Sequence, residues 1–365
     1  MAQVDIKIPV GILGATGMVG QRFICLLQNH PWFEITAVAA SQRSAGKTYT
    51  RAVAGRWTGA GPIPKKIAAM KVYDVQKDLK TIAAKASFVF CALDADKQLI
   101  KKIEEDYAAA DLGVVSNNSA HRLSADVPMV MPEINPKHLE MIEVQRQKRG
   151  WNKGFIVVKP NCSIQCYVPL VTAWKKFGPQ KIIVSTYQAI SGAGKTFASW
   201  PEMVDNAIPY IGGEEEKSET EPSKIWAKIE NGKFKLATRP QISASCIRVP
   251  VSDGHMAAIN IRFSKKPTQA QLIKALTDFP NPLDGLKLPS APKPFLIYFE
   301  QDDRPQTRLD RDLGNGMAIA VGRLRQDLVL DWKCVALSHN TVRGAAGGSI
   351  LTAELLLKKG YIKIK

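Results

Sequence analysis

Short apolar runs alternate with longer segments of helical periodicity along the first half of the chain. The helical segments carry apolar residues on one face, as Phe23, Leu26 and Leu27 do after the first run. The pattern predicts buried strands at Lys7–Leu13, Glu34–Ala40, Phe88–Leu93 and Leu112–Ser116, and a further helix at Lys97–Ala110. Strands that alternate with helices predict an α/β fold with a parallel sheet covered on both faces.

The second half of the chain carries another series of strand-like runs. Strands are predicted at Phe155–Val158, Ile182–Gln188, Ile242–Val249, Ala257–Phe263 and Pro294–Phe299. One long helix is predicted at Ser163–Phe177, with a kink at Pro169. The pattern favours a second domain built on an antiparallel sheet.

Composition narrows the class of protein. The chain has 365 residues, of which 45% are hydrophobic and 23% charged, as in globular proteins of two or three domains. No apolar run approaches the roughly 18 residues of a membrane span, and the N-terminus shows no secretory signal. The chain has six cysteines, and the four outside the candidate site lie in apolar segments: Cys25, Cys91, Cys246 and Cys334. Their placement predicts reduced thiols and a cytoplasmic protein.

The formal net charge of +17 needs a reason. Nucleic acid and small anions are both candidate partners of so basic a chain. The basic residues are scattered, apart from short runs such as Lys65–Lys66, and no nucleic-acid motif accompanies them. A solvated basic surface is the simplest interpretation, and small anionic ligands are favoured over nucleic acid.

A glycine-rich turn follows the first predicted strand and leads into the first predicted helix. Its glycines are Gly11, Gly14, Gly17 and Gly20, spaced three apart. Such a turn lets the backbone approach a pyrophosphate, and the helix N-terminus adds N–H groups and a positive dipole. The alternative is a tight turn without a ligand. The predicted cofactor-binding residues here are Gly14, Ala15, Thr16, Gly17, Met18 and Val19.

The loop after the second predicted strand indicates which dinucleotide binds. A site for NAD usually ends this strand with a carboxylate that holds the ribose 2′-hydroxyl. This chain continues instead with Ser41, Arg43, Ser44 and Lys47. Hydroxyls and cations suit a 2′-phosphate, so the predicted cofactor is NADP. An ordinary basic loop is the alternative.

The segment SNNSAHR, residues 116–122, leaves another strand end, where ligands collect in parallel sheets. Arg122 is therefore a candidate anion clamp, although an exposed loop arginine has the same appearance.

Cys162 follows the strand-breaking pair Pro160–Asn161 and lies at the start of the predicted helix. A helix dipole stabilises a thiolate there and lowers the thiol pKa, so Cys162 is predicted to be a nucleophile. The alternative is a buried structural cysteine. Cys166, one turn further on, is predicted to pack in the core. No second cysteine or histidine pair lies nearby, and no metal site is predicted.

Two further segments carry candidate chemistry. Gln188 ends a predicted strand directly before the glycine turn at Ser191 and Gly192. Arg248 and His255 are separated by seven positions across the turn at 252–254. We expect this histidine and this cation to share one pocket with the activated cysteine.

Five motifs, in this combination and order, resemble the aspartate-β-semialdehyde dehydrogenase family, and its archaeal and fungal-type branch best. They are NCS at 161–163, YQAISGAG at 187–194, GGEEEK at 212–217, RVPVSDGH at 248–255 and SHNTVRGAAG at 338–347. The resemblance implies NADPH-dependent conversion of β-aspartyl phosphate to L-aspartate 4-semialdehyde through a cysteine thioester. That reaction lies on the route to lysine, methionine and threonine.

The resemblance also implies a role for each matching residue. Cys162 corresponds to the nucleophile, His255 to the acid/base and Gln188 to the residue that orients the substrate. Arg248 corresponds to the arginine at the substrate α-carboxylate and Glu215 to the acid at its amine, with Glu214 and Glu216 as neighbouring alternatives. The remaining implied contacts are Lys217 and Arg122 for phosphate, Asn161 for the substrate, and Ser191, Gly192 and Asn340 near the nicotinamide.

The expected architecture is a Rossmann-type nucleotide-binding domain plus an α+β catalytic and dimerisation domain with a mixed, largely antiparallel sheet. The first domain is predicted at residues 1–155 and takes back a C-terminal helix at 344–365; the second is predicted at 156–343. Family members associate through the second sheet, so a homodimer or homotetramer is expected.

Other functions compete with this one. A malonyl-CoA reductase or an N-acetyl-glutamyl-phosphate reductase on the same scaffold would use the same cysteine, histidine and NADP. A basic nucleic-acid-binding protein is the alternative from a different class, and it leaves Cys162, Gln188, Arg248 and His255 unexplained.

Overall fold

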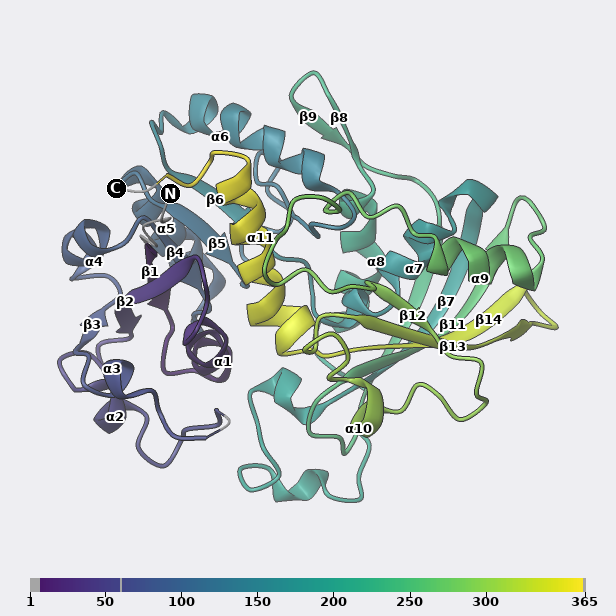
Figure 1. Cartoon of the computed structure of the whole chain (residues 1–365), viewed down its shortest axis with the longest axis horizontal. Helices are drawn as coiled ribbons and strands as arrows, with labels where there is room; N and C mark the ends of the chain where they lie inside the picture. The colour runs from purple at the N-terminus through teal and green to yellow at the C-terminus, as the bar shows by residue number, and fades with distance from the viewer. Residues whose placement is uncertain (1–6, 60, 364–365) are drawn as a thin grey trace, which may run out of the picture.

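The computed structural model describes residues 7–59 and 61–363 and contains two six-stranded sheets that lie side by side (Figure 1). The first sheet has the order β3-β2-β1-β4-β5-β6, and every pair in it is parallel. Its strands are β1 Ile8–Leu13, β2 Phe33–Ala40, β3 Val72–Asp74, β4 Phe88–Cys91, β5 Gly113–Ser116 and β6 Phe155–Val158. The predicted parallel α/β sheet is therefore confirmed, and its order reverses beside β1, where such sheets bind ligands.

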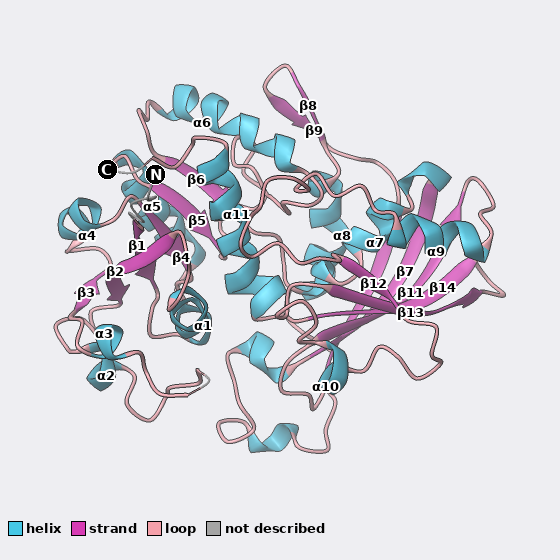
Figure 2. Ribbon diagram, in the orientation of Figure 1, coloured by secondary structure: helices cyan, strands magenta, loops and turns pink. Residues whose placement is uncertain are grey.

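Helices cover both faces of the first sheet (Figure 2). They are α1 Met18–Leu27, α4 Leu79–Lys85, α5 Lys97–Ala109 and α6 Met141–Arg149, with the short α2 Tyr49–Ala52 and α3 Lys65–Ala68. The C-terminal helix α11, Gly347–Lys358, packs against β5. It is shorter than the predicted helix at 344–365, because residues 342–346 form a separate kinked turn and residues 359–363 leave the helix after Lys358. The last two residues of the predicted helix lie outside the described chain.

The second sheet has the order β10-β7-β11-β14-β13-β12. Its strands are β7 Pro179–Gln188, β10 Gln241–Arg248, β11 His255–Phe263, β12 Leu296–Tyr298, β13 Ile319–Gln326 and β14 Trp332–Ser338. The outer pairs β10–β7 and β12–β13 are parallel and the three inner pairs are antiparallel, which confirms a mixed, largely antiparallel sheet. Although β10 and β11 follow each other in sequence, β7 lies between them.

Further helices and a short hairpin lie between the strands of the two sheets in the sequence. They are η1 Pro136–Glu140, η4 Ile190–Ala193, η5 Pro201–Met203, α8 Glu214–Ile225, the hairpin β8 Lys228–Glu230 and β9 Lys233–Lys235, α9 Gln269–Thr277, and α10 Thr307–Asp310.

The long helix predicted at Ser163–Phe177 is broken into three pieces. These are η2 Ser163–Gln165, α7 Val168–Ala173 and η3 Lys175–Phe177. Pro169 lies in the first turn of α7, where its missing N–H costs no hydrogen bond. The prediction of one kinked helix was wrong because proline began a new helix instead of bending an existing one.

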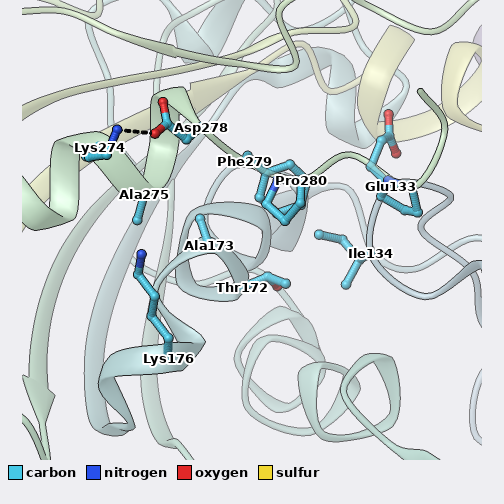
Figure 3. A pocket seen from close by; sticks show the side chains of 11 residues that line it. Glu133, Ile134, Thr172, Ala173, Lys176, Lys274, Ala275, Asp278, Phe279 and Pro280 are labelled. Carbon is cyan, nitrogen blue, oxygen red and sulfur yellow. Dashed lines mark hydrogen bonds and ion pairs between the residues drawn. The ribbon is translucent and has the colours of Figure 1, made fainter. Parts of the chain in front are cut away.

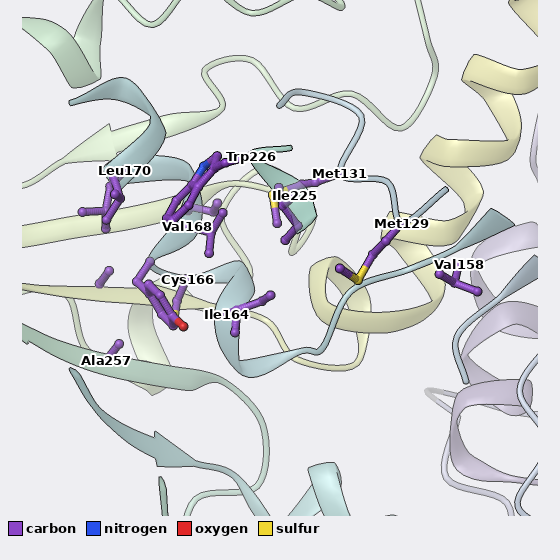
Figure 4. Close-up of a cluster of buried hydrophobic side chains, with 14 of the residues drawn as sticks. Met129, Met131, Val158, Ile164, Cys166, Val168, Leu170, Ile225, Trp226 and Ala257 are labelled. Carbon is purple, nitrogen blue, oxygen red and sulfur yellow. The ribbon is translucent and has the colours of Figure 1, made fainter. Parts of the chain in front are cut away.

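One hydrophobic core joins the two sheets. It contains Val89 and Val114 of the first sheet together with Val184 and Ile259 of the second. Cys166 is fully buried in it, near Ile164 and Val168 (Figure 4), so its predicted packing role is confirmed. The predicted domain boundary at residue 155 falls on the first residue of β6, and that division remains a prediction. Within the described residues, no helix has the length and apolar character needed to cross a membrane.

Candidate active site

The structure brings Cys162 and His255 together from opposite parts of the second half. Cys162 follows β6 after a three-residue link, and His255 is the first residue of β11. Cys162 Sγ lies 3.5 Å from His255 Nε2. This separation is suited to proton exchange between a thiol and an imidazole.

The backbone of a single residue, Ala189, orients both His255 and Arg248. The Ala189 N–H donates to His255 Nδ1 at 3.1 Å, and its carbonyl accepts from Arg248 Nη1 at 2.7 Å. Gly192 fits closely against both side chains, since a Cβ there would lie 2.8 Å from Arg248 Nη1 and 3.1 Å from His255 Nε2. The predicted shared pocket for this histidine and this cation is therefore present, with Gln188 buried directly before Ala189.

Burial sets the ionisation of the reacting pair. It lowers the pKa of His255 to about 3, with the neighbouring Arg248 cation adding to the effect. It also raises the pKa of the Cys162 thiol to about 11, and Glu214 adds to that rise. The cations of Arg122, Arg248 and Lys159 act in the opposite direction.

The prediction that a helix dipole lowers the Cys162 pKa was wrong. Cys162 precedes only the three-residue turn η2, not a long helix, so few peptide dipoles are aligned behind it. In the ligand-free site, desolvation therefore has the larger effect on the thiol.

A second group of side chains surrounds Asn161, the residue before the nucleophile. The Asn161 amide donates to both carboxylate oxygens of Glu214, at 2.9 and 3.1 Å. Lys217 donates to the same carboxylate at 2.8 Å. Asn161, Glu214 and Lys217 thus form one polar cluster beside Cys162.

Glu215, the residue predicted at the substrate amine, lies elsewhere. Its carboxylate accepts from the Cys246 N–H of β10 at 3.1 Å. The helix α8 begins at Glu214, and each residue turns the side chain by about 100°. Glu214, Lys217, Ser218 and Glu221 therefore share the face toward the nucleophile, while Glu216 is exposed on the opposite side of the helix. The amine contact stays a prediction, and this geometry favours Glu214 over Glu215 for it.

Arg122 is almost fully buried, unlike an ordinary loop arginine. Its Nε donates to the Lys159 carbonyl at 2.9 Å and its Nη2 to the Asn117 carbonyl at 3.0 Å. Its Nη1 pairs with Glu221 at 2.9 Å. Two N–H groups of the five on a guanidinium remain for a ligand.

Three residues near the nucleophile were not among the predicted site residues, although one of them, Gly344, lies in the motif at 338–347. Glu221 holds Arg122, and Lys159 is buried three positions before Cys162. Burial, with Arg343 adding to it, holds the pKa of the Lys159 amine well below its usual value. The third is Gly344, where a Cβ would lie 2.8 Å from the Cys162 Cβ. A helix-like spacing after Lys217 was the only available signal for Glu221.

Asn340 connects two loops that border the site. Its side-chain oxygen accepts from the Gly254 N–H and its amide donates to Ser191 Oγ, both at 2.8 Å. The adjacent segment is anchored by the buried Arg343, which pairs with Glu133 through both Nη atoms. Asn340 and Ser191 are thus brought together as the predicted nicotinamide contacts require.

The glycine turn has the backbone features of a dinucleotide site. Gly14 adopts φ +85°, and a Cβ there would lie 2.2 Å from the Ala92 carbonyl oxygen. No side chain caps α1 after Gly17, which leaves its first N–H groups for a phosphate. At the end of β2, Ser41 and Arg43 are exposed and Ser44 is buried. These residues fit a dinucleotide that carries a 2′-phosphate.

A cavity of about 140 Å³ lies between this turn and the second half of the chain, with Met18 and Arg22 on one side and Ser191 on the other. A larger cavity, of about 580 Å³, lies beside the ion pair of Lys274 and Asp278 (Figure 3). Its lining includes Glu133 and none of the predicted site residues, so the chemistry is assigned to the Cys162 region. Among the described residues, no group of three or more His, Cys, Asp or Glu side chains could hold a metal ion.

Family models match both halves of the chain. The model described as semialdehyde dehydrogenase, NAD binding domain, matches residues 9–142. The model described as semialdehyde dehydrogenase, dimerisation domain, matches residues 168–343.

Relatives and a solved structure agree with these matches. Aspartate-semialdehyde dehydrogenase of Archaeoglobus fulgidus is 44% identical, covering 97% of this chain and 99% of the relative. The enzyme of the same name from Schizosaccharomyces pombe is 45% identical, again covering 97% and 99%. The crystal structure of aspartate semialdehyde dehydrogenase with NADP from Candida albicans is 39% identical and superimposes with a TM-score of 0.86, covering 98% of this chain and all of that one.

Proposed function

This chain belongs to the aspartate-semialdehyde dehydrogenase family, and from that premise we infer which of its side chains perform the reaction. The protein is an NADP-dependent, phosphorylating aldehyde oxidoreductase of amino-acid biosynthesis. The observation that supports the site assignment most is the Cys162–His255 contact of 3.5 Å, with Arg248 and His255 both held by the backbone of Ala189.

Cys162 attacks the acyl carbon of β-aspartyl phosphate as a thiolate. The C–S bond forms, the C–O bond to phosphate breaks, and the phosphate leaves with that electron pair and takes up a proton. When bound, NADPH supplies the hydride that reduces the resulting thioester. The tetrahedral oxyanion then re-forms a carbonyl, and the C–S bond breaks to return the thiolate and release the aldehyde.

His255 acts on the reacting atoms through the proton on Nε2, because this nitrogen faces Cys162 Sγ. The Ala189 N–H donates to Nδ1 and so favours the tautomer with the proton on Nε2. The neutral ring that burial enforces can then donate a hydrogen bond from Nε2 to the oxyanion or to the leaving thiolate, while the proton stays on the ring. Positioned acid/base groups contribute about 10²–10⁴-fold in rate.

The charged side chains around the pair sort the parts of the substrate. Arg248 grips the α-carboxylate, Glu214 accepts from the amine, and Arg122 and Lys217 bind phosphate, with Gln188 and Asn161 orienting the reacting carbonyl. The support is their placement at the ends of β7 and β10, in the loops that carry Arg122 and Asn161, and on α8. Attraction of anions to a positively charged cleft would also account for the net positive charge of the chain, because substrate, phosphate and NADP are all anions.

The cofactor contacts follow from the glycine turn and the two loops joined by Asn340. The N–H groups of Thr16, Met18 and Val19 would hold the pyrophosphate, because those of Gly14 and Ala15 already donate to the Ala39 carbonyl and that of Gly17 to the Gly14 carbonyl. Gly14, Ala15 and Gly17 would let the pyrophosphate approach the backbone, and Ser41, Arg43 and Ser44 would hold the 2′-phosphate. Ser191, Gly192 and Asn340 border the nicotinamide. The support is the positive φ of Gly14, the uncapped start of α1 and the contact between Asn340 and Ser191.

The deciding experiment compares substrates in the oxidative direction. NADP reduction is measured with aspartate semialdehyde plus phosphate and, separately, with malonate semialdehyde plus coenzyme A. We expect turnover only with the first pair. Turnover with the second pair would indicate a malonyl-CoA reductase. The full-length similarity to aspartate-semialdehyde dehydrogenases does not favour that function.

We propose a homodimer, or a homotetramer built from it, because residues 168–343 match a dimerisation domain. Light scattering across a concentration series measures the assembly. The proposed cytoplasmic location fits a site that needs Cys162 as a free thiol.

A further inference from the structure

We propose that Glu221 is a positioning residue for the phosphate-dependent half of the reaction: its carboxylate fixes the Arg122 guanidinium against the backbone of the nucleophile loop. The inference rests on the proposed function, in which Arg122 binds the phosphate. Glu221 itself contacts no reacting atom in this arrangement and acts through Arg122.

The Glu221 carboxylate joins three separate segments. It lies on α8 and is 2% exposed. One oxygen accepts from Arg122 Nη1 at 2.9 Å, in the loop after β5, and the other accepts from the Asn161 N–H at 2.7 Å, one residue before the nucleophile. This single side chain therefore sets the distance between the arginine and the nucleophile loop.

The contacts close into a ring. Arg122 Nε donates to the Lys159 carbonyl, Arg122 Nη1 to Glu221, and the Asn161 N–H to the other oxygen of Glu221. The segment from Lys159 to Asn161 is thus held at both ends by one ion pair. Arg122 Nη2 also donates to the Asn117 carbonyl, so all three nitrogens of the guanidinium are held and its plane is fixed. The directions of its two remaining N–H groups are therefore fixed as well.

Only a carboxylate suits this position. Both groups that face Glu221 are donors, and an ionised carboxylate presents acceptors alone. A glutamine of the same shape must turn its NH₂ group toward either Arg122 or the Asn161 N–H, and one of the two must move. A buried donor left unsatisfied is costly, so Glu221→Gln should shift the arginine or the loop rather than leave both in place.

The effect should fall on the phosphate step. His255 and Arg248 are held by Ala189, and none of the three touches Glu221 among the contacts of the described residues. Addition of Cys162 to the aldehyde and oxidation to the thioester need those groups and no phosphate. Release of the thioester by phosphate needs the oriented Arg122, because a bidentate grip depends on the angle of the guanidinium.

The test compares Glu221→Gln with Glu216→Gln, a matched change on the exposed side of the same helix. Wild-type enzyme is mixed with NADP and aspartate semialdehyde without phosphate, and the NADPH burst is recorded; steady-state turnover is then measured against phosphate concentration. For Glu221→Gln we expect the burst to persist, while the KM for phosphate rises about 10- to 100-fold, the range for a lost charge-assisted hydrogen bond. Glu216→Gln should match the wild type in both.

A second readout needs neither cofactor nor turnover. Inorganic phosphate should slow alkylation of Cys162 by iodoacetamide, and the phosphate concentration for half-protection should rise in Glu221→Gln by the same 10- to 100-fold as the KM. Half-protection unchanged from wild type would overturn the positioning role.

The outcomes separate this inference from the proposed function. A wild-type enzyme without a burst, or with turnover independent of phosphate, would defeat the thioester mechanism itself. A wild-type burst with Glu221→Gln indistinguishable from Glu216→Gln would defeat only the role of Glu221. If Glu221→Gln does not fold, Glu221→Asp keeps both acceptor oxygens and decides: it should keep the burst with a weaker response to phosphate, and a normal response would overturn the proposal.

Discussion

The two sides of Cys162 are built differently. On one side, His255 and Arg248 are fixed by the backbone of Ala189, and burial holds the imidazole neutral. On the other side, Arg122, Glu221, Glu214 and Lys217 are fixed by one another as ion pairs. The first we call the backbone-held half and the second the ion-paired half.

The difference corresponds to what each half must do. A group that shares a proton with the substrate needs a constant direction and an environment that sets its pKa, and a rigid peptide provides the direction. Groups that bind and release anions need charge that is already compensated when the ligand is absent, because an unpaired buried charge is costly. Substitutions should therefore change rate constants in the backbone-held half and apparent affinities in the ion-paired half.

The largest expected effect is at the nucleophile, which lies between the halves. Cys162→Ala should abolish activity, because no other thiol can form the thioester. Cys166→Ala is the control and should retain most activity, since Cys166 packs in the core. Mass spectrometry after substoichiometric alkylation should place the label on Cys162. A label on Cys166 would contradict the assignment of Cys162 as the nucleophile between the two halves.

In the backbone-held half, His255→Asn should lower kcat by about 10²–10⁴-fold. Asparagine cannot reproduce the ring nitrogen that faces Sγ, while the Ala189 peptide and Arg248 stay in place. The KM for NADP should hardly change, because His255 is not among the predicted cofactor contacts. Steady-state kinetics measures both, and an unchanged kcat would return His255 to a structural role.

In the ion-paired half, Glu214→Gln and Glu215→Gln form a matched pair on neighbouring positions. Glu214 contacts Asn161 and Lys217, whereas Glu215 contacts the backbone of β10. Glu214→Gln should lower kcat/KM for aspartate semialdehyde by about 10- to 100-fold, mainly through KM. Glu215→Gln should change kcat/KM by no more than about threefold, because it weakens a single hydrogen bond to a backbone N–H and Glu215 is only partly buried. The reverse order would restore Glu215 as the amine contact.

The last prediction changes no residue and concerns the pH dependence of the free enzyme. Because burial raises the pKa of the Cys162 thiol to about 11, the thiolate fraction should increase through alkaline pH instead of saturating near the ordinary value of about 8.5. The alkylation rate of Cys162 should therefore rise about tenfold per pH unit from pH 7 to pH 10. A plateau by pH 8 would show that the cations of Arg122, Arg248 and Lys159 outweigh burial at the Cys162 thiol.

Local patterns predicted much of the fold. The strands β1, β2, β4, β5, β6, β7, β10 and β11 lie within a few residues of their predicted positions, because their apolar runs are bounded by turn residues. The glycine turn was recognisable for the same reason, since strand, glycines and helix are contiguous. The broken helix after Cys162 was missed because an apolar segment shows its hydrophobicity, not whether proline starts a new helix.

The sequence by itself determined the parallel α/β sheet and the glycine turn, and it predicted Cys162, His255, Arg248 and Gln188 as the reacting set, since each lies in a short contiguous motif. Only the tertiary structure decided which of three consecutive glutamates faces the site, because the start of α8 sets the direction of every later side chain. It also decided that β7 lies between β10 and β11, that burial outweighs the helix dipole at Cys162, and that Glu221 joins Arg122 to Asn161. Residues 122, 161 and 221 are far apart in the chain, and local sequence carries no information on which distant charges will meet when the chain folds.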